Sequence, residues 1–160
     1  WFSPDFAGEP VPSFAQAADF CLGHGIMMNA EIKPVPGTAR ECGRAVAAAC
    51  ARMPEGSVLL SSFSVEALDA AREAAPAVPR ALLVEAVPED WRERLGNVGA
   101  MALHAKAGLL QPAQADAVKA AGFGLMVYTV NDPAEARALF AMGVDAVCTD
   151  RLDLIGPDFR

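Results

Sequence analysis

The chain has 160 residues, of which 53% are hydrophobic and 21% are charged, a composition typical of a globular domain with a sizeable core. Its formal net charge of -7 at pH 7 argues against nucleic acid and against anionic membrane surfaces as partners. No apolar run approaches the roughly 20 residues of a membrane-spanning helix, so we expect no stable membrane insertion. The chain begins with Trp1 rather than Met, and we expect it to be processed or cut from a longer protein.

The first third of the chain alternates helix and strand patterns. Ser13, with a glutamine three residues later, forms a capping-box pattern that starts a helix, and Gly25 ends this helix. The apolar run 26–32 predicts the first strand. Apolar residues at helical spacing between residues 42 and 53 predict the next helix, which Pro54 ends.

The middle of the chain repeats this alternation. Residues 57–62 and 80–84 predict the second and third strands. Ser64 is a capping residue for the helix between these strands. Pro88 opens a short helix, and we expect Gly96 to close it.

The last third predicts three more strands, at residues 98–103, 124–130 and 145–149. A helix is expected at about residues 112–121, and Asp132, followed by a proline, starts the last helix. Short apolar strands with helices between them are typical of an α/β protein with a parallel sheet. Both a doubly wound open sheet and a (β/α)8 barrel fit, although no G-x-G-x-x-G motif follows the early strands.

The four cysteines form no C-x-x-C pair. Cys21, Cys42, Cys50 and Cys148 lie in helix-like or strand-like patterns. We therefore expect buried free thiols in a reducing, cytoplasmic environment, and neither disulfides nor a zinc site.

Polar side chains at the predicted strand ends favour the barrel. They follow five of the six strands: Glu31 and Lys33, Ser61 and Ser62, His104, Thr129 and Asn131, and Thr149 and Asp150. In a barrel the carboxyl ends of all strands meet at one mouth, whereas in an open sheet only the switch point faces a ligand. The alternative explanation is that strand-to-helix loops are polar in any α/β fold, because such residues often cap the next helix.

The most informative stretch is Asn-Ala-Glu-Ile-Lys-Pro at residues 29–34. Strand alternation places Asn29, Glu31 and Lys33 on one face. An acid and a base so close together at a strand end cannot both be buried cheaply without a partner, and a metal or an anionic substrate would supply one. Taken alone, such a pair is most often an ordinary salt bridge, so the rest of the chain must decide.

Four segments, taken in order, resemble the glycerophosphodiester phosphodiesterase family, most closely its cytoplasmic bacterial type. They are residues 29–34, 60–63 (Leu-Ser-Ser-Phe), 127–131 (Val-Tyr-Thr-Val-Asn) and 143–150 (Gly-Val-Asp-x-x-x-Thr-Asp). The resemblance covers essentially all of residues 1–160, which we interpret as a single, partial phosphodiesterase barrel domain. It implies a TIM (β/α)8 barrel of which about the last six strand–helix units are present.

The resemblance also implies an activity, the hydrolysis of glycerophosphodiesters to an alcohol and sn-glycerol 3-phosphate. The family uses a divalent cation, here expected to be Mg2+ or Ca2+, and two histidines as acid and base. Its His-Arg-Gly, Glu-x-Asp and His-Asp motifs are not in this sequence, whose only histidines are His24 and His104. We therefore expect this chain alone to be poorly active or inactive.

Individual residues take their expected roles from the same resemblance. Glu31 matches a metal ligand, and Lys33 matches a catalytic lysine that binds the phosphodiester and neutralises it in the transition state. Phe63, His104 and Tyr128 are expected to line the substrate pocket. Each residue has a structural alternative: an ion pair between Glu31 and Lys33, a hydrophobic staple for Phe63, and core positions for His104 and Tyr128.

Two other functions stay open at this stage. A Schiff-base lyase with Lys33 as nucleophile predicts trapping by borohydride and indifference to chelators. A non-catalytic binding domain made from a degenerate barrel predicts a stable monomer or dimer without turnover. A homo-oligomer is a further expectation if the strand at residues 26–32 is left as an uncovered edge.

Overall fold

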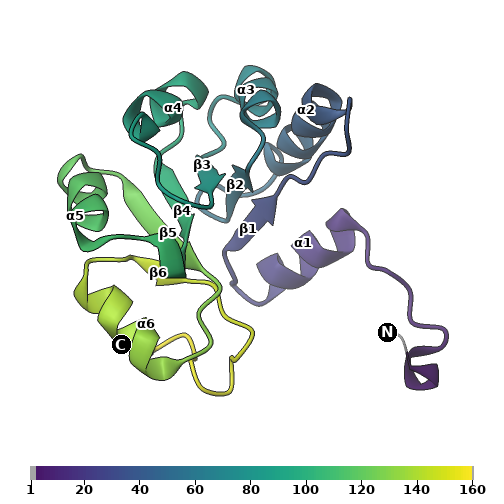
Figure 1. Cartoon of the computed structure of the whole chain (residues 1–160). Coiled ribbons are helices and arrows are strands. Elements are labelled where there is room, and N and C mark those ends of the chain that lie inside the picture. The colour runs from purple at the N-terminus through teal and green to yellow at the C-terminus, as the bar shows by residue number, and fades with distance from the viewer. Residues whose placement is uncertain (1–2, 160) are drawn as a thin grey trace.

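The computed structural model describes residues 3–159 and shows six parallel strands in one sheet (Figure 1). The strands are β1 (Met28–Glu31), β2 (Val58–Ser62), β3 (Arg80–Val84), β4 (Ala102–Lys106), β5 (Gly124–Tyr128) and β6 (Ala146–Val147). Each strand pairs with the next one in the chain, so that the order is β1-β2-β3-β4-β5-β6. This parallel, sequential order confirms the barrel prediction and excludes a doubly wound sheet.

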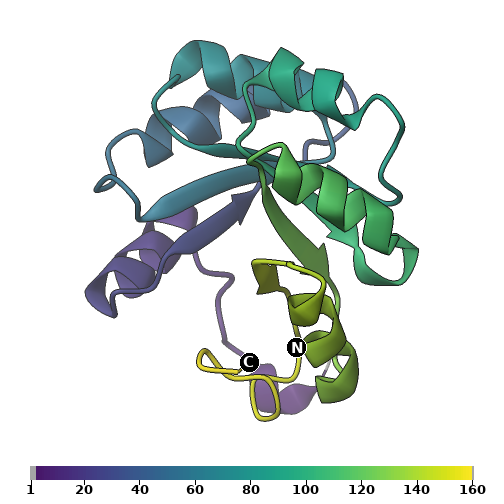
Figure 2. The ribbon, with the colours of Figure 1, turned by 90° about the vertical axis from the view of Figure 1, so that its left-hand side faces the viewer.

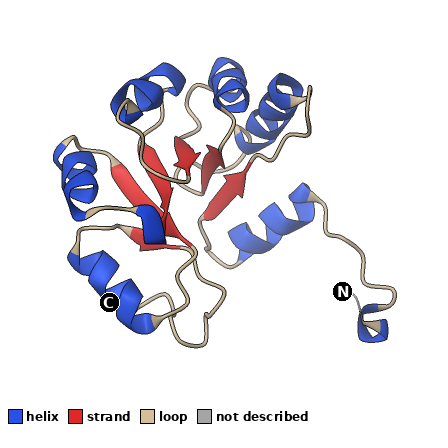
Figure 3. Ribbon diagram, viewed as in Figure 1, coloured by secondary structure: helices blue, strands red, loops and turns tan. Residues whose placement is uncertain are grey.

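Helices follow the strands and cover the outside of the arc that the strands form (Figures 2 and 3). The helical elements are η1 (Pro4–Phe6), α1 (Phe14–Gly23), α2 (Ala39–Cys50), α3 (Val65–Ala74), α4 (Trp91–Val98), η2 (Ala107–Leu109), α5 (Pro112–Ala120) and α6 (Pro133–Ala141). The arc is open, with α1 beside β1 at one of its ends (Figure 1). The described residues thus form a partial TIM barrel. No described helix is long and apolar enough to span a bilayer.

Three of the predicted helix starts are confirmed by their caps. The Ser13 side chain accepts a hydrogen bond from the backbone N–H of Gln16, whose own side chain completes the capping box. Ser64 caps α3 through the backbone N–H of Ala67. The Asp132 carboxylate accepts from the N–H two residues later and caps α6.

Alternation along the strands separates a helix-facing side from an inner side. Ile32, directly after β1, and Leu60 on β2 belong to a core cluster with α2 and α3. Leu103 on β4 belongs to a second cluster with α4 and α5. The residues between them, such as Glu31 and Ser61, therefore face the concave inner side of the arc. This places the predicted polar residues on the side that forms the mouth.

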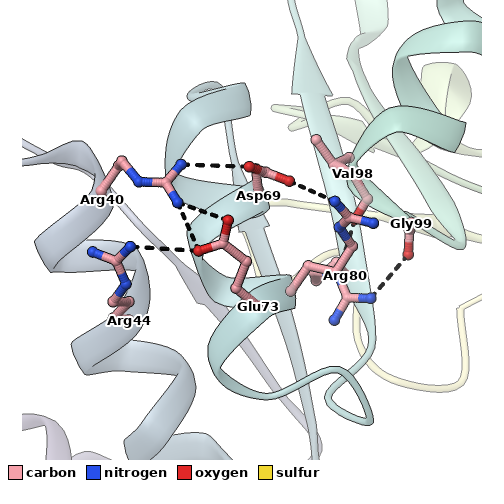
Figure 4. A network of polar contacts seen from close by, with 8 residues as sticks. Arg40, Arg44, Asp69, Glu73, Arg80, Val98 and Gly99 are labelled. Atoms are coloured by element: carbon pink, nitrogen blue, oxygen red, sulfur yellow. Dashed lines mark hydrogen bonds and ion pairs between the residues drawn. The ribbon is translucent and has the colours of Figure 1, made fainter.

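Small residues, among them Gly43 and Ala67, form the contact between α2 and α3, and ion pairs between side chains flank it. Figure 4 shows Arg40 of α2 between two carboxylates of α3, with distances of 2.6 Å to Glu73 and 3.4 Å to Asp69. Arg44 reaches Glu73 at 3.4 Å. The hydrogen bond from Arg40 is the main reason why the pKa of Glu73 lies below its usual value. These side chains are exposed or half-buried, so they specify how the two helices align more than they stabilise the fold.

Arg80, at the start of β3, is buried and has no carboxylate partner among residues 3–159. Its guanidinium donates to the backbone carbonyls of Val98 at 3.1 Å and of Gly99 at 3.2 Å (Figure 4). It also donates to the carbonyl of Val78 at 2.6 Å. Burial lowers the pKa of this guanidinium. Since Val98 and Gly99 lie at the carboxyl end of α4, the helix dipole offsets part of the buried charge. Arg80 thereby joins β3 to the end of the next helix.

The fourth strand lies elsewhere than the sequence pattern predicts. We expected it at residues 98–103, after a helix closed by Gly96, but α4 continues through Gly96 to Val98. Gly99 adopts the left-handed conformation, with a φ of 59°, and caps the helix. The prediction was wrong because two glycines follow Leu95 and only the second is the cap, which moves β4 to residues 102–106.

Smaller differences concern strand lengths and thiols. The first, fifth and sixth strands are shorter than predicted, and β6 has only two residues. All four cysteines are free, as expected, but only Cys50 is buried, and Cys148 is exposed. The expectation of buried thiols therefore holds for one cysteine of the four.

Candidate active site

The predicted site residues gather at the carboxyl ends of the strands. Glu31 ends β1 and Lys33 follows it, Phe63 follows β2, and Tyr128 ends β5. The rings of Phe63 and Tyr128 meet edge to face, with centroids 6.0 Å apart. Since β2 and β5 are not neighbours in the sheet, this contact crosses the concave side of the arc. The curvature of the sheet thus brings residues from separate strands to one mouth.

Glu31 and Lys33 form an ion pair at this mouth. The Lys33 Nζ lies 3.4 Å from a carboxylate oxygen of Glu31, and the two side chains are 76% and 30% exposed, respectively. Such an exposed pair contributes little to stability, so Lys33 can turn to another anion at low cost. Both residues line an open hollow of about 450 Å³, which also includes Pro34 and Phe63. The site therefore has a cation, an anion and an aromatic wall around one space.

Tyr128 is held by the neighbouring part of the sheet. Its hydroxyl donates a hydrogen bond of 2.6 Å to the backbone carbonyl of Val84, which ends β3. Burial, and then the negative charges of Glu85 and Glu31, raise the pKa of the Tyr128 phenol. The phenol is therefore neutral at pH 7, and its ring is fixed beside Phe63. The sequence left a core position and a position at the substrate pocket as alternatives for Tyr128. In the structure Tyr128 is half-buried by its contacts with the sheet and also lies at the mouth.

His104 lies inside β4 and not after it. It is 1% exposed, and its Nδ1 atom has no hydrogen-bond partner among the described residues. Burial lowers the pKa of His104 to about 4, so the imidazole is neutral at pH 7. The expectation that His104 ends a strand was wrong, because β4 begins four residues later than predicted. Its assignment to the substrate pocket stays an untested prediction.

Two residues at the mouth were missed by sequence reasoning. Lys106 ends β4 and is exposed, and Glu85 directly follows β3. The backbone N–H of Lys106 donates to the carbonyl of Glu85 at 3.1 Å, which keeps the two strand ends together. Lys106 was missed because of the misplaced strand. Glu85 could have been predicted as a mouth residue, because the end of β3 at residue 84 was predicted correctly.

Asn131 joins the loops that follow β5 and β6. Its side-chain oxygen accepts hydrogen bonds from the Thr149 hydroxyl at 3.1 Å and from the Asp150 backbone at 2.8 Å. Its side-chain nitrogen donates to the Asp150 carboxylate at 3.1 Å. Asp150 therefore forms loop hydrogen bonds, in agreement with the structural role that its sequence context suggested.

The comparison with protein-family models decides the family. The model of the glycerophosphoryl diester phosphodiesterase family matches residues 1–154. The chain belongs to this family. Its fold agrees with the resemblance noted in the sequence. The comparison with curated proteins finds no significant match.

Solved structures of phosphodiesterases share the fold. One is a phosphodiesterase from Oleispira antarctica in complex with the product sn-glycerol-3-phosphate, with 31% identity, a TM-score of 0.82, and coverage of 87% of this chain and 57% of that chain. A second is a proposed glycerophosphoryl diester phosphodiesterase from Silicibacter pomeroyi, with 24% identity, a TM-score of 0.76, and coverage of 88% of this chain and 53% of that chain. The chain thus spans little more than half the length of these structures.

The described residues do not form a cation site of this phosphodiesterase family by themselves. No group of three or more His, Cys, Asp or Glu side chains among residues 3–159 could hold a metal ion. Glu31 offers one carboxylate, the oxygen ligand that hard cations prefer, but one carboxylate does not make a site. A divalent cation at Glu31 would therefore need further ligands from outside the described residues.

Proposed function

We propose that this chain supplies the phosphate-binding part of a phosphodiesterase that hydrolyses glycerophosphodiesters to an alcohol and sn-glycerol 3-phosphate. The observation that carries the proposal is the placement of Lys33 beside Glu31 in an open hollow at the mouth of the partial barrel. The likeness to the Oleispira antarctica phosphodiesterase, solved with sn-glycerol-3-phosphate, supports a small glycerophosphodiester as substrate.

In this proposal Lys33 is the catalytic residue that the chain contributes. Its ammonium group binds a phosphate oxygen and offsets the negative charge that increases in the transition state. Phe63 and Tyr128 present aromatic ring surface to the glycerol carbons. Glu31 would be one ligand of a divalent cation, Mg2+ or Ca2+, and the family resemblance is the support for that cation.

The acid and the base of the reaction are expected from outside this chain. His24 ends α1, and its Nδ1 lies 2.8 Å from the carbonyl of Phe20, a helix-end position. His104 is buried and neutral. Neither histidine lines the hollow, so neither is proposed as the acid or the base. The chain alone is therefore expected to bind the product but to turn over substrate poorly.

The experiment is a titration of the purified chain with sn-glycerol 3-phosphate, followed by calorimetry and by backbone amide NMR. Lys33→Met is expected to weaken binding about 10- to 100-fold, as loss of a charge-assisted contact does. Arg52→Met, which removes an exposed positive charge at the far end of α2, is the control and should bind like the parent chain. Equal binding by Lys33→Met and the parent would disprove the role of Lys33.

The alternative functions differ in the same assay. A Schiff-base nucleophile needs a lysine withdrawn from water, whereas Lys33 is 76% exposed, so the structure offers no support for a lyase. A non-catalytic binding domain would bind sn-glycerol 3-phosphate and would show no turnover even when the missing acid and base are supplied. A cytoplasmic location and a homo-oligomer stay predictions.

A further inference from the structure

One buried hydroxyl beside the site has no partner. Two side-chain polar atoms are buried and unpaired among the described residues, the Ser61 Oγ and the His104 Nδ1. Ser61 is 0% exposed. Buried hydroxyl groups normally form hydrogen bonds, because an unpaired one loses its hydration without compensation. An unpaired hydroxyl in this position therefore suggests a partner that it meets in another state of the site.

The neighbours of the two unpaired atoms differ. Ser61 is the register partner of Glu31 in the parallel pair of β1 and β2. In contrast, His104 has Leu83 and Met126 as its register partners on the two adjacent strands. Only Ser61 thus has an ionisable side chain directly beside it on the next strand.

Ser61 and Glu31 also share a face of the sheet. Ile32 and Leu60 pack in the core under α2 and α3, so alternation directs Glu31 and Ser61 to the opposite, inner side. Register partners on neighbouring strands lie about 5 Å apart at their Cβ atoms. The Glu31 side chain has three rotatable bonds and can therefore bring its carboxylate to the Ser61 hydroxyl.

In the structure Glu31 is paired with Lys33 instead, at 3.4 Å, and this pair is exposed. We propose that Ser61 is a second hydrogen-bond donor to Glu31, used when Lys33 turns from Glu31 to the phosphate of the substrate. The hydroxyl then donates to the carboxylate that Lys33 has left, and the buried donor gains a charged acceptor. Ser61 is thus a positioning residue, which acts on the substrate only through Glu31 and Lys33; the part played by phosphate rests on the proposed function.

Ser62 provides a matched control. Its hydroxyl is already paired, donating to the Ile32 carbonyl at 2.7 Å and accepting from the Ser64 N–H at 3.0 Å. Replacing Ser62 by alanine removes two hydrogen bonds in which neither Glu31 nor Lys33 takes part. Replacing Ser61 by alanine removes a hydrogen bond only in the state in which Lys33 is away from Glu31.

The test is a double-mutant cycle on folding, with Lys33→Met as a mimic of the released lysine. Ser61→Ala alone should change the folding equilibrium constant less than about threefold, whereas in the Lys33→Met background it should lower this constant about tenfold, the effect of a hydrogen bond to a charged group. Ser62→Ala should lower it by a similar factor in both backgrounds. A crystal structure of Lys33→Met should show the Ser61 hydroxyl within hydrogen-bond distance of the Glu31 carboxylate.

Additive effects of Ser61→Ala and Lys33→Met, or a Lys33→Met structure without this contact, would overturn the proposal. The cycle measures folding and does not depend on activity. Coupling between Ser61 and Lys33 in a chain that fails to bind sn-glycerol 3-phosphate would uphold the Ser61–Glu31 contact and contradict the proposed function. The two hypotheses can therefore fail separately.

Discussion

Gly43 of α2 lies directly against the backbone of Ala67 of α3. A Cβ atom added to Gly43 would lie 3.0 Å from the carbonyl carbon of Ala67 and closer still to the carbonyl oxygen. Both residues are buried, and α2 and α3 pack tightly along this line. The helices approach each other this closely because glycine has no side chain at the contact.

Gly43→Ala is expected to destabilise the fold by about 1–3 kcal/mol, because the added methyl group meets backbone and not a flexible side chain. Urea unfolding followed by circular dichroism measures this change. Gly96→Ala is the matched control, since Gly96 lies within α4 and a Cβ there would meet nothing within 4 Å. This control should stabilise by about 0.5–1 kcal/mol through helix propensity. A stabilising Gly43→Ala would show that the helices are not in contact at this point.

Arg80→Met is expected to cost about 2–4 kcal/mol, because it leaves the buried carbonyls of Val78 and Val98 without this donor and also removes the bond to Gly99. Arg80→Lys should recover less than half of this loss, since a single ammonium group cannot reach all the carbonyls that the guanidinium fork reaches. Thermal unfolding of the three proteins compares them. Full stability of Arg80→Lys would mean that charge alone, and not the fork, is what the site needs.

The pKa of His104 predicts a pH dependence of stability. Burial lowers this pKa from 6.5 to about 4 in the folded chain, so between these values the unfolded chain binds a proton that the folded chain does not. The contribution of neutral His104 to the free energy of unfolding is therefore complete above pH 6.5. It is lost as the pH falls toward 4, by up to about 3 kcal/mol in total.

The measurement is the free energy of unfolding from pH 7.5 to pH 4.5, for the parent chain and for His104→Gln. The difference between the two curves isolates His104 from the carboxylates that titrate at lower pH. Parallel curves would mean that the folded chain accepts the proton on His104, and that the imidazole is not shielded from water.

Phe63→Ala is expected to weaken binding of sn-glycerol 3-phosphate about 5- to 20-fold, because the ring supplies apolar surface at the hollow. Its side chain is 50% exposed, so the loss of stability should be small. Val65→Ala, at a nearby position that is 43% exposed but outside the hollow, is the control for apolar truncation. Titration calorimetry distinguishes the two variants, and equal affinities would place Phe63 outside the binding site.

Local signals explain why much of the fold could be predicted. The limits of β3 were exact, because Pro79 directly precedes residues 80–84 and the charged Glu85 directly follows them. The helix starts at Ser13, Ser64 and Asp132 were found because a cap is a hydrogen bond between residues close in sequence. At the end of α4 the local signal was ambiguous, since Gly96 and Gly99 both suit a cap and only packing selects between them.

The rest of the site depends on the curvature of the sheet, which no local pattern encodes. The contact between Phe63 and Tyr128 joins strands that are not neighbours in the sheet. The unpaired hydroxyl of Ser61 likewise depends on the register between two strands. Similarly, α2 packs against α3 through the small residues Gly43 and Ala47. The helical spacing of apolar residues did not single them out.

The two kinds of arginine contact imply an order of events in acid. Arg40 bridges α2 to α3 through carboxylates, and protonation of Glu73 and Asp69 removes these contacts. Arg80 donates to peptide carbonyls, which do not titrate. Its hydrogen bonds to the end of α4 therefore persist at a pH at which the carboxylates between α2 and α3 are protonated. Acid should therefore loosen the contact between α2 and α3 before it releases Arg80 from the end of α4, and hydrogen exchange in these helices would follow this order.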